Sequence, residues 1–122
     1  GSMQPVLHDD PYAFACLPIG KTPPAGIFAT VAEDEGLTLI ARASVLRAAG
    51  IDPGPPFARI SLTVHSALEA VGLTAALARA LADRGISANV VAGFHHDHIF
   101  VGWDDRDAAV AALLALSGST GA

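Results

Sequence analysis

The sequence predicts an α+β fold in which an antiparallel sheet carries helices on one face. Several segments alternate apolar and polar residues with the two-residue period of a half-buried strand. The segment 71–84 instead places its apolar residues on one helical stripe, at spacings of three and four residues. The Asp-Pro-Gly-Pro-Pro run at 52–56 is the strongest break in the chain, so we expect two halves on either side of it.

Three short strands are expected in the N-terminal half. Apolar residues and two aromatic side chains favour a strand at 12–17. Alternation of apolar and polar residues indicates two more strands, at 27–33 and 37–41, and the Asp34-Glu35-Gly36 turn between them makes a hairpin. The segment 18–26 contains three prolines and two glycines, so we expect a loop there.

A short helix at 43–49 is expected to complete this half. Ser44 is a suitable N-cap and Gly50 a suitable C-terminal residue for it. Together with the three strands, the helix gives a βββα half over residues 12–52. Residues 1–11 are polar and bounded by proline, and we expect a flexible arm whose first two residues are typical of a cloning scar.

Residues 57–116 are expected to form the C-terminal half, with strands and helices in the order βαββα. The expected elements are a strand at 57–64, a helix at 71–84, strands at 89–94 and 98–103, and a helix at 106–116. Ser66 and Glu69 have capping-box spacing before the first helix, and Asp104-Asp105 offers an N-cap for the second. Residues 117–122 are expected to form a disordered tail. This order is the ferredoxin-like pattern without its last strand, which a first-half strand could supply.

The segment 62–100 resembles the ACT domain. The resemblance lies in TVHS and LEAVGLTA within 63–75, and in ISANVVAGF and HDHIFV within 86–101. The chain is similar in particular to small stand-alone bacterial ACT proteins of unknown function, through 12–17 and 35–39 as well. The resemblance implies an ACT fold of the βαββαβ type in a tandem or one-and-a-half arrangement. Arginine-sensing CASTOR proteins and the regulatory tail of aspartate kinases have similar arrangements.

The resemblance also implies that a small effector, usually an amino acid, binds at the strand-to-helix loop 64–74. Backbone N–H groups at a helix start lack intrahelical partners, so those near Gly72 and Leu73 would receive the ligand carboxylate. Gly72 would let the ligand approach the backbone closely. On the neighbouring strand, Asn89 would read the ligand amine together with Glu69. The expected ligand-binding residues are Val64, His65, Ser66, Leu68, Glu69, Val71, Gly72, Leu73, Thr74, Asn89, Val90, Val91 and Ala92.

A simpler interpretation of the same loop stays open. Ser66 and Glu69 could only cap the helix, and Gly72 could only permit close packing. The chain would then be a structural or protein-interaction module whose ligand pocket has been lost.

Histidines gather around Asp97, and imidazole and carboxylate are good ligands for zinc, nickel or copper. On one strand, His96 and His98 share a face while His95 and Asp97 point the other way. A metal site would therefore need a third ligand, His65, from elsewhere. An ordinary turn at 95–97 explains the same residues, so we expect a structural or ligand-orienting role and no metal or cofactor. The alternative is a small metal-dependent or acid–base enzyme that uses His65, His96 and His98.

No motif in the sequence indicates catalysis. The chain contains no GxSxG, P-loop or GxGxxG pattern. Cys16 is the only cysteine, and in an apolar strand it is expected to be a small buried hydrophobe. We therefore expect no catalytic residue.

Composition excludes several classes of protein and partner. The net charge is −5 and the basic residues are scattered, which disfavours nucleic acid and anionic membranes as partners. There is no apolar run of the about 18–20 residues that a membrane span needs, and no signal peptide, so we expect a cytoplasmic location. Apolar residues make up 52% of the 122, which suggests a core plus a subunit interface. We expect a homodimer, with an unidentified enzyme or regulator as a further partner.

Overall fold

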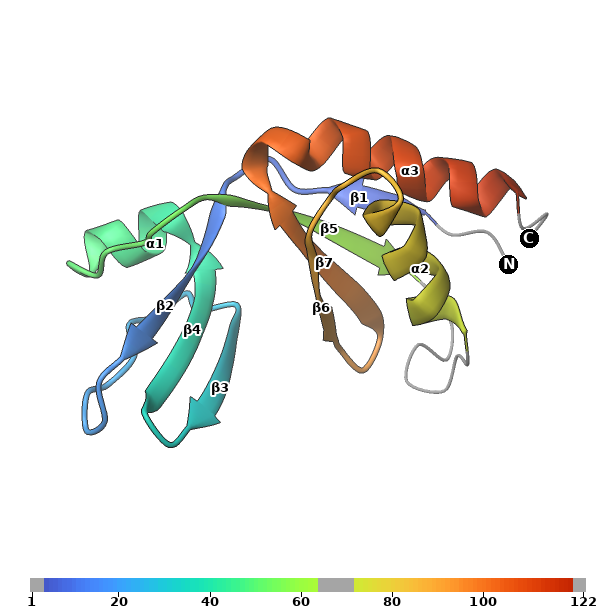
Figure 1. The fold of residues 1–122 in the computed structure, drawn as a ribbon. Helices are drawn as coiled ribbons and strands as arrows, with labels where there is room; N and C mark the ends of the chain where they lie inside the picture. Colours follow the sequence, from blue (N-terminus) through green and yellow to red (C-terminus); the bar gives the residue numbers. More distant parts are fainter. Residues whose placement is uncertain (1–3, 64–71, 120–122) are drawn as a thin grey trace. The chain divides into compact units, whose positions relative to one another are not determined.

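The computed structural model describes residues 4–63 and 72–119 (Figure 1). It divides into two compact units. The main unit consists of Gly1–Asp9 and Ala58–Ala122, and the inserted unit, Asp10–Phe57, lies between these two segments in the sequence. The helices and strands are β1 (Pro5–Leu7), β2 (Tyr12–Leu17), β3 (Ala29–Glu33), β4 (Gly36–Arg42), α1 (Ala43–Ala48), β5 (Phe57–Thr63), α2 (Leu73–Ala82), β6 (Ala88–Ala92), β7 (His96–Gly102), the 3-10 helix η1 (Trp103–Asp105) and α3 (Arg106–Ser119).

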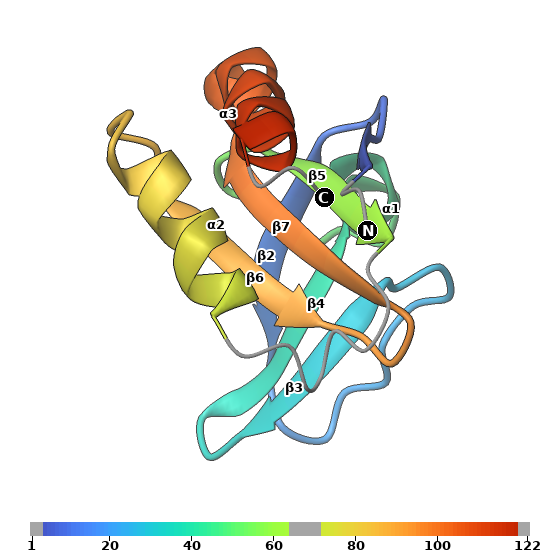
Figure 2. The same ribbon diagram turned by 90° about the vertical axis from the view of Figure 1, so that its right-hand side faces the viewer.

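In the main unit, four strands form a sheet in the order β1-β5-β7-β6, and helices α2 and α3 cover one face of it (Figure 1 and Figure 2). Both helices and the sheet contribute to one apolar core. Its buried residues are Ala58, Ile60, Leu62, Leu77, Leu81, Ile86, Ile99, Val101, Ala109, Ala112 and Leu113. This arrangement confirms the predicted ferredoxin-like α+β fold, in which an antiparallel sheet carries helices on one face.

The fourth strand of this sheet comes from the extreme N-terminus. Pro5, Val6 and Leu7 pair antiparallel with Leu62, Ser61 and Ile60 of β5, and the His8 N–H donates to the Arg59 carbonyl at 3.0 Å. The expectation of a flexible arm over residues 1–11 is therefore wrong for β1. Three residues are too few to show a strand period, and a proline is tolerated at the first position of an edge strand. Leu7 packs against the core, which holds the strand in register.

The turn before β7 and the end of α3 differ from the sequence-based expectation. Strand β7 begins at His96, so the turn lies at 93–95 rather than 95–97. Helix α3 continues to Ser119, so the expected disordered tail is wrong for 117–119, and residues 120–122 lie outside the described part of the chain. Asp104 and Asp105 lie in η1, which leads into α3.

The inserted unit has the strand order β3-β4-β2, and Tyr12 of β2 also pairs with Phe57, the first residue of β5. All three strands were expected from the sequence, as was helix α1. Gly36 is the first residue of β4. A Cβ at this position would lie 2.7 Å from the Leu17 carbonyl oxygen and 2.8 Å from Cys16 Sγ. The close approach of β2 therefore requires glycine in this hairpin.

Two details of the inserted unit correct the sequence analysis. Ser44 lies inside α1 rather than at its N-cap, which is Arg42 and makes no side-chain cap. The first N–H of the helix, on Ala43, instead donates to the Pro11 carbonyl at 2.9 Å, so no side chain is needed there. Cys16 is exposed rather than buried, because it lies on the face of β2 opposite the buried Leu17.

Among the described residues, no helix has the length and apolar character needed to span a bilayer.

Candidate functional site

The described part of the predicted ligand loop is the start of helix α2. Gly72 is the N-cap, with φ of 85°, and its carbonyl accepts from the Ala76 N–H at 2.9 Å. Leu73 is half-buried against the core and Thr74 is exposed. No side chain of the described residues caps this end of the helix. A Cβ at Gly72 would meet no described atom within 4 Å, so the left-handed φ, rather than close packing, favours glycine here.

Most of the predicted loop lies outside the described residues. The residues that lie outside the described part of the chain are Val64, His65, Ser66, Leu68, Glu69 and Val71. The capping box formed by Ser66 and Glu69 therefore stays a prediction.

The predicted residues of β6 are divided between the two faces of the sheet. Asn89 pairs with Phe100 and Val91 with His98, whereas Val90 pairs with Ile99 and Ala92 with Asp97. Paired residues share a face, so Val90 and Ala92 lie on the face that α2 and α3 cover, and Asn89 and Val91 lie on the other. The four residues cannot line one pocket.

The sequence led us to expect β6 beside β5, and this expectation is wrong. Strand β7 lies between them, and β6 forms the edge of the sheet. In the ferredoxin-like order, the hairpin that follows α2 places its second strand, β7, beside β5. A ligand at the start of α2 would therefore have β7, rather than β6, beside β5.

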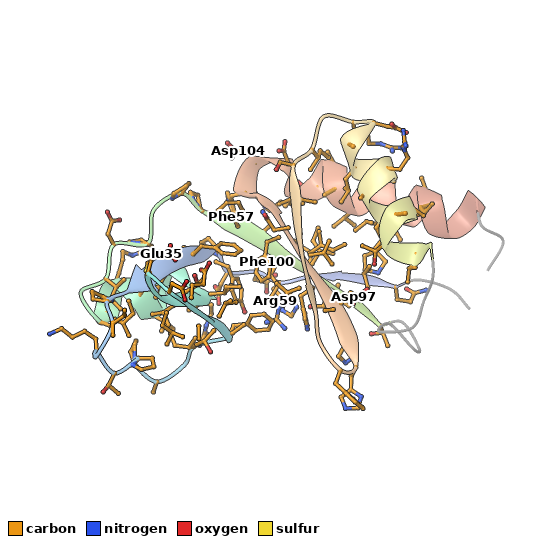
Figure 3. The ribbon with its side chains drawn as sticks, turned by 60° about the horizontal axis from the view of Figure 1, so that its bottom comes forward. Glu35, Phe57, Arg59, Asp97, Phe100 and Asp104 are labelled. Carbon is orange, nitrogen blue, oxygen red and sulfur yellow. The ribbon has the colours of Figure 1, made fainter. Side chains whose placement is uncertain are left out.

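Asp97 is a buried carboxyl on the helix-covered face of β7. Its exposed fraction is 2%, and it shares this face with the core residues Ile99 and Val101. Asp97 is labelled in Figure 3. Burial raises the pKa of the Asp97 carboxyl above its ordinary value. The predicted division of faces, with His96 and His98 opposite Asp97, is confirmed by this burial pattern.

Asp97 lies toward the same end of the sheet as the start of α2. Helix α2 leads into β6 and packs on it, so the C-terminal end of α2 lies near Ala88. Its first turn consequently lies toward Ala92, the partner of Asp97. The helix start and the buried carboxyl thus share one face and one end of the sheet.

On the opposite face, three polar side chains form a hydrogen-bonded row across adjacent strands. Ser61 Oγ on β5 lies 2.9 Å from Nε2 of His8, which follows β1, and 2.8 Å from Nδ1 of His98 on β7. We call these three residues the histidine–serine row. Sequence reasoning did not find it, because the row depends on β1 lying beside β5.

Burial lowers the pKa of both histidines in this row. The pKa of His98 falls from 6.5 to about 4, first through desolvation and then through the charges of Arg59, His96 and His8. Desolvation and Arg59 also lower the pKa of His8, while Asp9 acts in the opposite direction. Both rings are therefore neutral near pH 7.

A neutral, hydrogen-bonded His98 does not suit the alternative enzyme. A base whose pKa lies near 4 accepts protons poorly at neutral pH. The Nδ1 atom of His98 is engaged by Ser61, and the described residues contain no group of three His, Cys, Asp or Glu placed to hold a metal ion. His65, the expected third ligand, lies outside the described residues.

Two surface hollows lie away from the predicted site. One, of about 410 Å³, lies between α2 and α3, and the other, of about 430 Å³, lies in the inserted unit beside the end of α1. The first is lined by Ala76, Arg79, Ala80, Asp83, Arg84, Ala112, Ala115 and Leu116. The second is lined by Leu17, Pro18, Lys21, Thr22, Pro24, Ala49 and Ile51. Neither includes a residue predicted to bind the ligand.

Comparison with protein families finds an ACT domain in each half of the chain. One family model, described as an ACT domain, matches residues 58–115, and a second ACT-domain model matches residues 1–58. The comparison with curated proteins gives no match.

Solved structures resemble the chain over nearly its whole length. A Vibrio cholerae protein of unknown function, described as a possible transport protein, is 44% identical, with a TM-score of 0.81 over 95% of this chain and 91% of the other. A protein from Agrobacterium tumefaciens is 18% identical, with a TM-score of 0.75 over 96% and 90%. The regulatory subunit of aspartate kinase from Thermus flavus is 12% identical, with a TM-score of 0.67 over 95% and 99%. At such low identity, the last two show the fold alone.

Proposed function

Since the chain belongs to the ACT-domain family, we propose that it is a regulatory protein that binds an amino acid at the start of helix α2. The observation that carries this proposal is the left-handed Gly72 N-cap. It leaves the first turn of a ten-residue helix without a side-chain cap from the described residues. Free N–H groups at the positive end of a helix dipole favour a carboxylate.

The ligand ammonium needs an acceptor close to that helix start. Asn89 together with Glu69 was expected in this role, but Asn89 lies on the face opposite the helices. Asp97 lies on the helix-covered face, toward the same end as the first turn of α2. A buried carboxyl is costly when ionised alone, and a ligand ammonium would offset that cost. We therefore assign the ammonium contact to Asp97.

Thermal-shift measurements with common amino acids, their 2-oxo acids and their decarboxylated amines test the proposal. At least one amino acid should raise the melting temperature, while its two analogues, each lacking one charged group, should do so far less. If no amino acid stabilises the protein at millimolar concentration, the proposed function is wrong.

Variants locate the ligand once such an amino acid is found. Asp97→Asn should reduce the affinity for it by about tenfold or more, which corresponds to about 1.4 kcal/mol. The matched control is Asp83→Asn, which alters an exposed aspartate after α2 and should bind as the wild type does. Equal affinity of Asp97→Asn and wild type would contradict the assigned role of Asp97.

We also propose a homodimer in which two β6 edge strands pair. Strand β6 has no charged residue, and Val90 at 36% and Phe94 at 81% are exposed beside this edge. An uncharged edge strand readily pairs with another strand. Light scattering should report a dimer that Val90→Lys disrupts, whereas Val31→Lys, on the β3 edge of the inserted unit, should remain dimeric. A monomeric wild type, or equal dimerisation of both variants, would contradict this arrangement.

In this proposal the protein acts in the cytoplasm, and its ligand-bound state regulates an enzyme or a regulator. Pull-downs with and without the stabilising amino acid test this part. A partner retained in only one of the two states is the expected result.

A further inference from the structure

The hydrogen bonds of the histidine–serine row connect three adjacent strands of the main unit. Ser61 lies on the central strand β5, with His98 on β7 to one side and His8, directly after β1, to the other. A neutral imidazole has one N–H donor and one acceptor nitrogen. The single Ser61 hydroxyl proton can therefore donate to one ring while its oxygen accepts from the other. The row is fully satisfied only when each ring presents the complementary nitrogen.

Besides this row, strand β1 is held by its backbone pairing with β5, by Leu7 in the core and by contacts with α3. It contains three residues, and in this register only Val6 and the following His8 direct their N–H groups toward β5. Val6 is 51% exposed, so Leu7 supplies the apolar anchor and the His8 N–H supplies a backbone bond, to the Arg59 carbonyl. A short edge strand of this kind opens at lower free energy than the core of its unit.

Protonation changes this row in two ways. A protonated ring donates from both nitrogens, so two protonated rings would both donate to Ser61 and leave its hydroxyl proton without either ring as acceptor. Two new positive charges would also lie beside Arg59, whose charge already acts on both rings. His96 adds to this repulsion on His98, and Asp9 partly offsets it on His8.

We propose that the His8–Ser61–His98 row is an acid-sensitive latch that holds strand β1 on the sheet of the main unit. In the neutral form the row ties His8 to β5 and β7. In the protonated form, the positive charges of His98 and Arg59 repel the charged His8. Strand β1 then leaves β5, while the helices and the remaining strands stay folded. This inference is independent of the proposed ligand.

Hydrogen exchange on the whole chain tests the latch at about pH 7 and about pH 4.5, after correction for the intrinsic pH dependence of exchange. Protection of the Val6 and His8 amides, whose N–H groups point toward β5, should fall by about tenfold or more at the lower pH, relative to the amides of β7 and α3. Unchanged protection of β1, or an equal fall throughout the main unit, would overturn the proposal.

Two substitutions remove the titration while keeping a hydrogen-bonding atom near Ser61. His98→Asn places an amide atom near the position of Nδ1, and His8→Gln places one near the position of Nε2. The double variant should retain β1 protection at both pH values, and His95→Asn, an exposed histidine outside the row, should behave as the wild type. A double variant that loses β1 protection with acid, as the wild type does, would contradict the latch.

The wild-type protein gives a second readout that needs no variant. The His98 ring signals should titrate well below pH 6.5 in an NMR titration, in step with the loss of β1 protection. Titration of His98 near its ordinary value would overturn the proposal even if the variants did not fold.

Discussion

Ser61 Oγ and His98 Nδ1 lie 2.8 Å apart on adjacent strands of the main unit. This contact joins the central strand β5 to the strand that also carries the buried Asp97. The same serine reaches His8 on its other side. One hydroxyl thus connects the N-terminal segment to β7. The same strand carries Asp97, the residue proposed to bind the ligand ammonium, on its opposite face.

Removal of the hydroxyl should destabilise the main unit. Ser61→Ala leaves His8 and His98 without their shared partner, and a half-buried hydrogen-bonding group left unsatisfied costs about 1–2 kcal/mol. Urea unfolding at neutral pH measures this loss. Ser87→Ala, which alters an exposed serine, is the control, and a loss in Ser61→Ala no larger than in this control would contradict the role of the row.

The lowered pKa of His98 makes stability depend on pH. The folded-state pKa, about 4, lies below the ordinary value of 6.5, so the unfolded chain binds the proton more readily. The contribution is fully present above about pH 6.5 and is lost as pH falls toward about pH 4. Wild type should therefore lose more unfolding free energy over this window than His98→Asn. Parallel curves for the two proteins would show that His98 does not titrate as described.

Gly36 should tolerate no side chain. Its Cβ would lie 2.7 Å from the Leu17 carbonyl oxygen and 2.8 Å from Cys16 Sγ, and the backbone oxygen cannot move without disturbing β2. Overpacking of this kind costs about 1–3 kcal/mol, so Gly36→Ala should lower the unfolding free energy by that amount. Gly20→Ala introduces a methyl group at a positive φ in open space, and so measures the backbone term alone. Equal losses in the two variants would contradict the steric explanation.

Asp97→Asn should preserve or increase the stability of the ligand-free protein at neutral pH. Burial raises the pKa of Asp97, so the folded state favours the protonated carboxyl, and this contribution to stability is lost as pH rises from the ordinary pKa of 3.8 through the raised pKa. An amide of the same shape carries no charge and removes this penalty. Urea unfolding at about pH 3 and about pH 7 should show the unfolding free energy of Asp97→Asn rising relative to that of wild type at the higher pH. A large loss of stability in the variant would mean that Asp97 is a structural residue.

The sequence predicted most elements of the fold but not how β1 completes it. The alternation predicted over 57–64 and the helical stripe predicted over 71–84 are long enough to show their periods, and the structure has β5 at Phe57–Thr63 and α2 at Leu73–Ala82. Pro5–Leu7 is too short to show one, and its partner β5 lies more than fifty residues away. The strand exists because β5 offers an open edge and the core accepts Leu7.

The candidate site could be predicted only in part, for a related reason. Gly72 is visible in the sequence, since a glycine before an apolar helical stripe indicates a helix start. The faces on which Asn89 and Asp97 lie depend on the register between β6 and β7. A shift of one residue in this register would exchange the two faces. Asp97 is buried because helices cover its face of the sheet, and the sequence does not show this cover. Aspartate is common in turns, so the residue type suggested a turn instead.

The central claim is that an amino acid binds at the start of α2 beside Asp97. Amide chemical shifts, followed by NMR during titration with the stabilising amino acid, test it most directly. The largest changes should fall on Leu73, Thr74 and Ala75 and on Asp97, and in Asp97→Asn the changes at the start of α2 should require about tenfold or more higher ligand concentration. Changes confined to the hollow between α2 and α3, or to the hollow in the inserted unit, would contradict the claim.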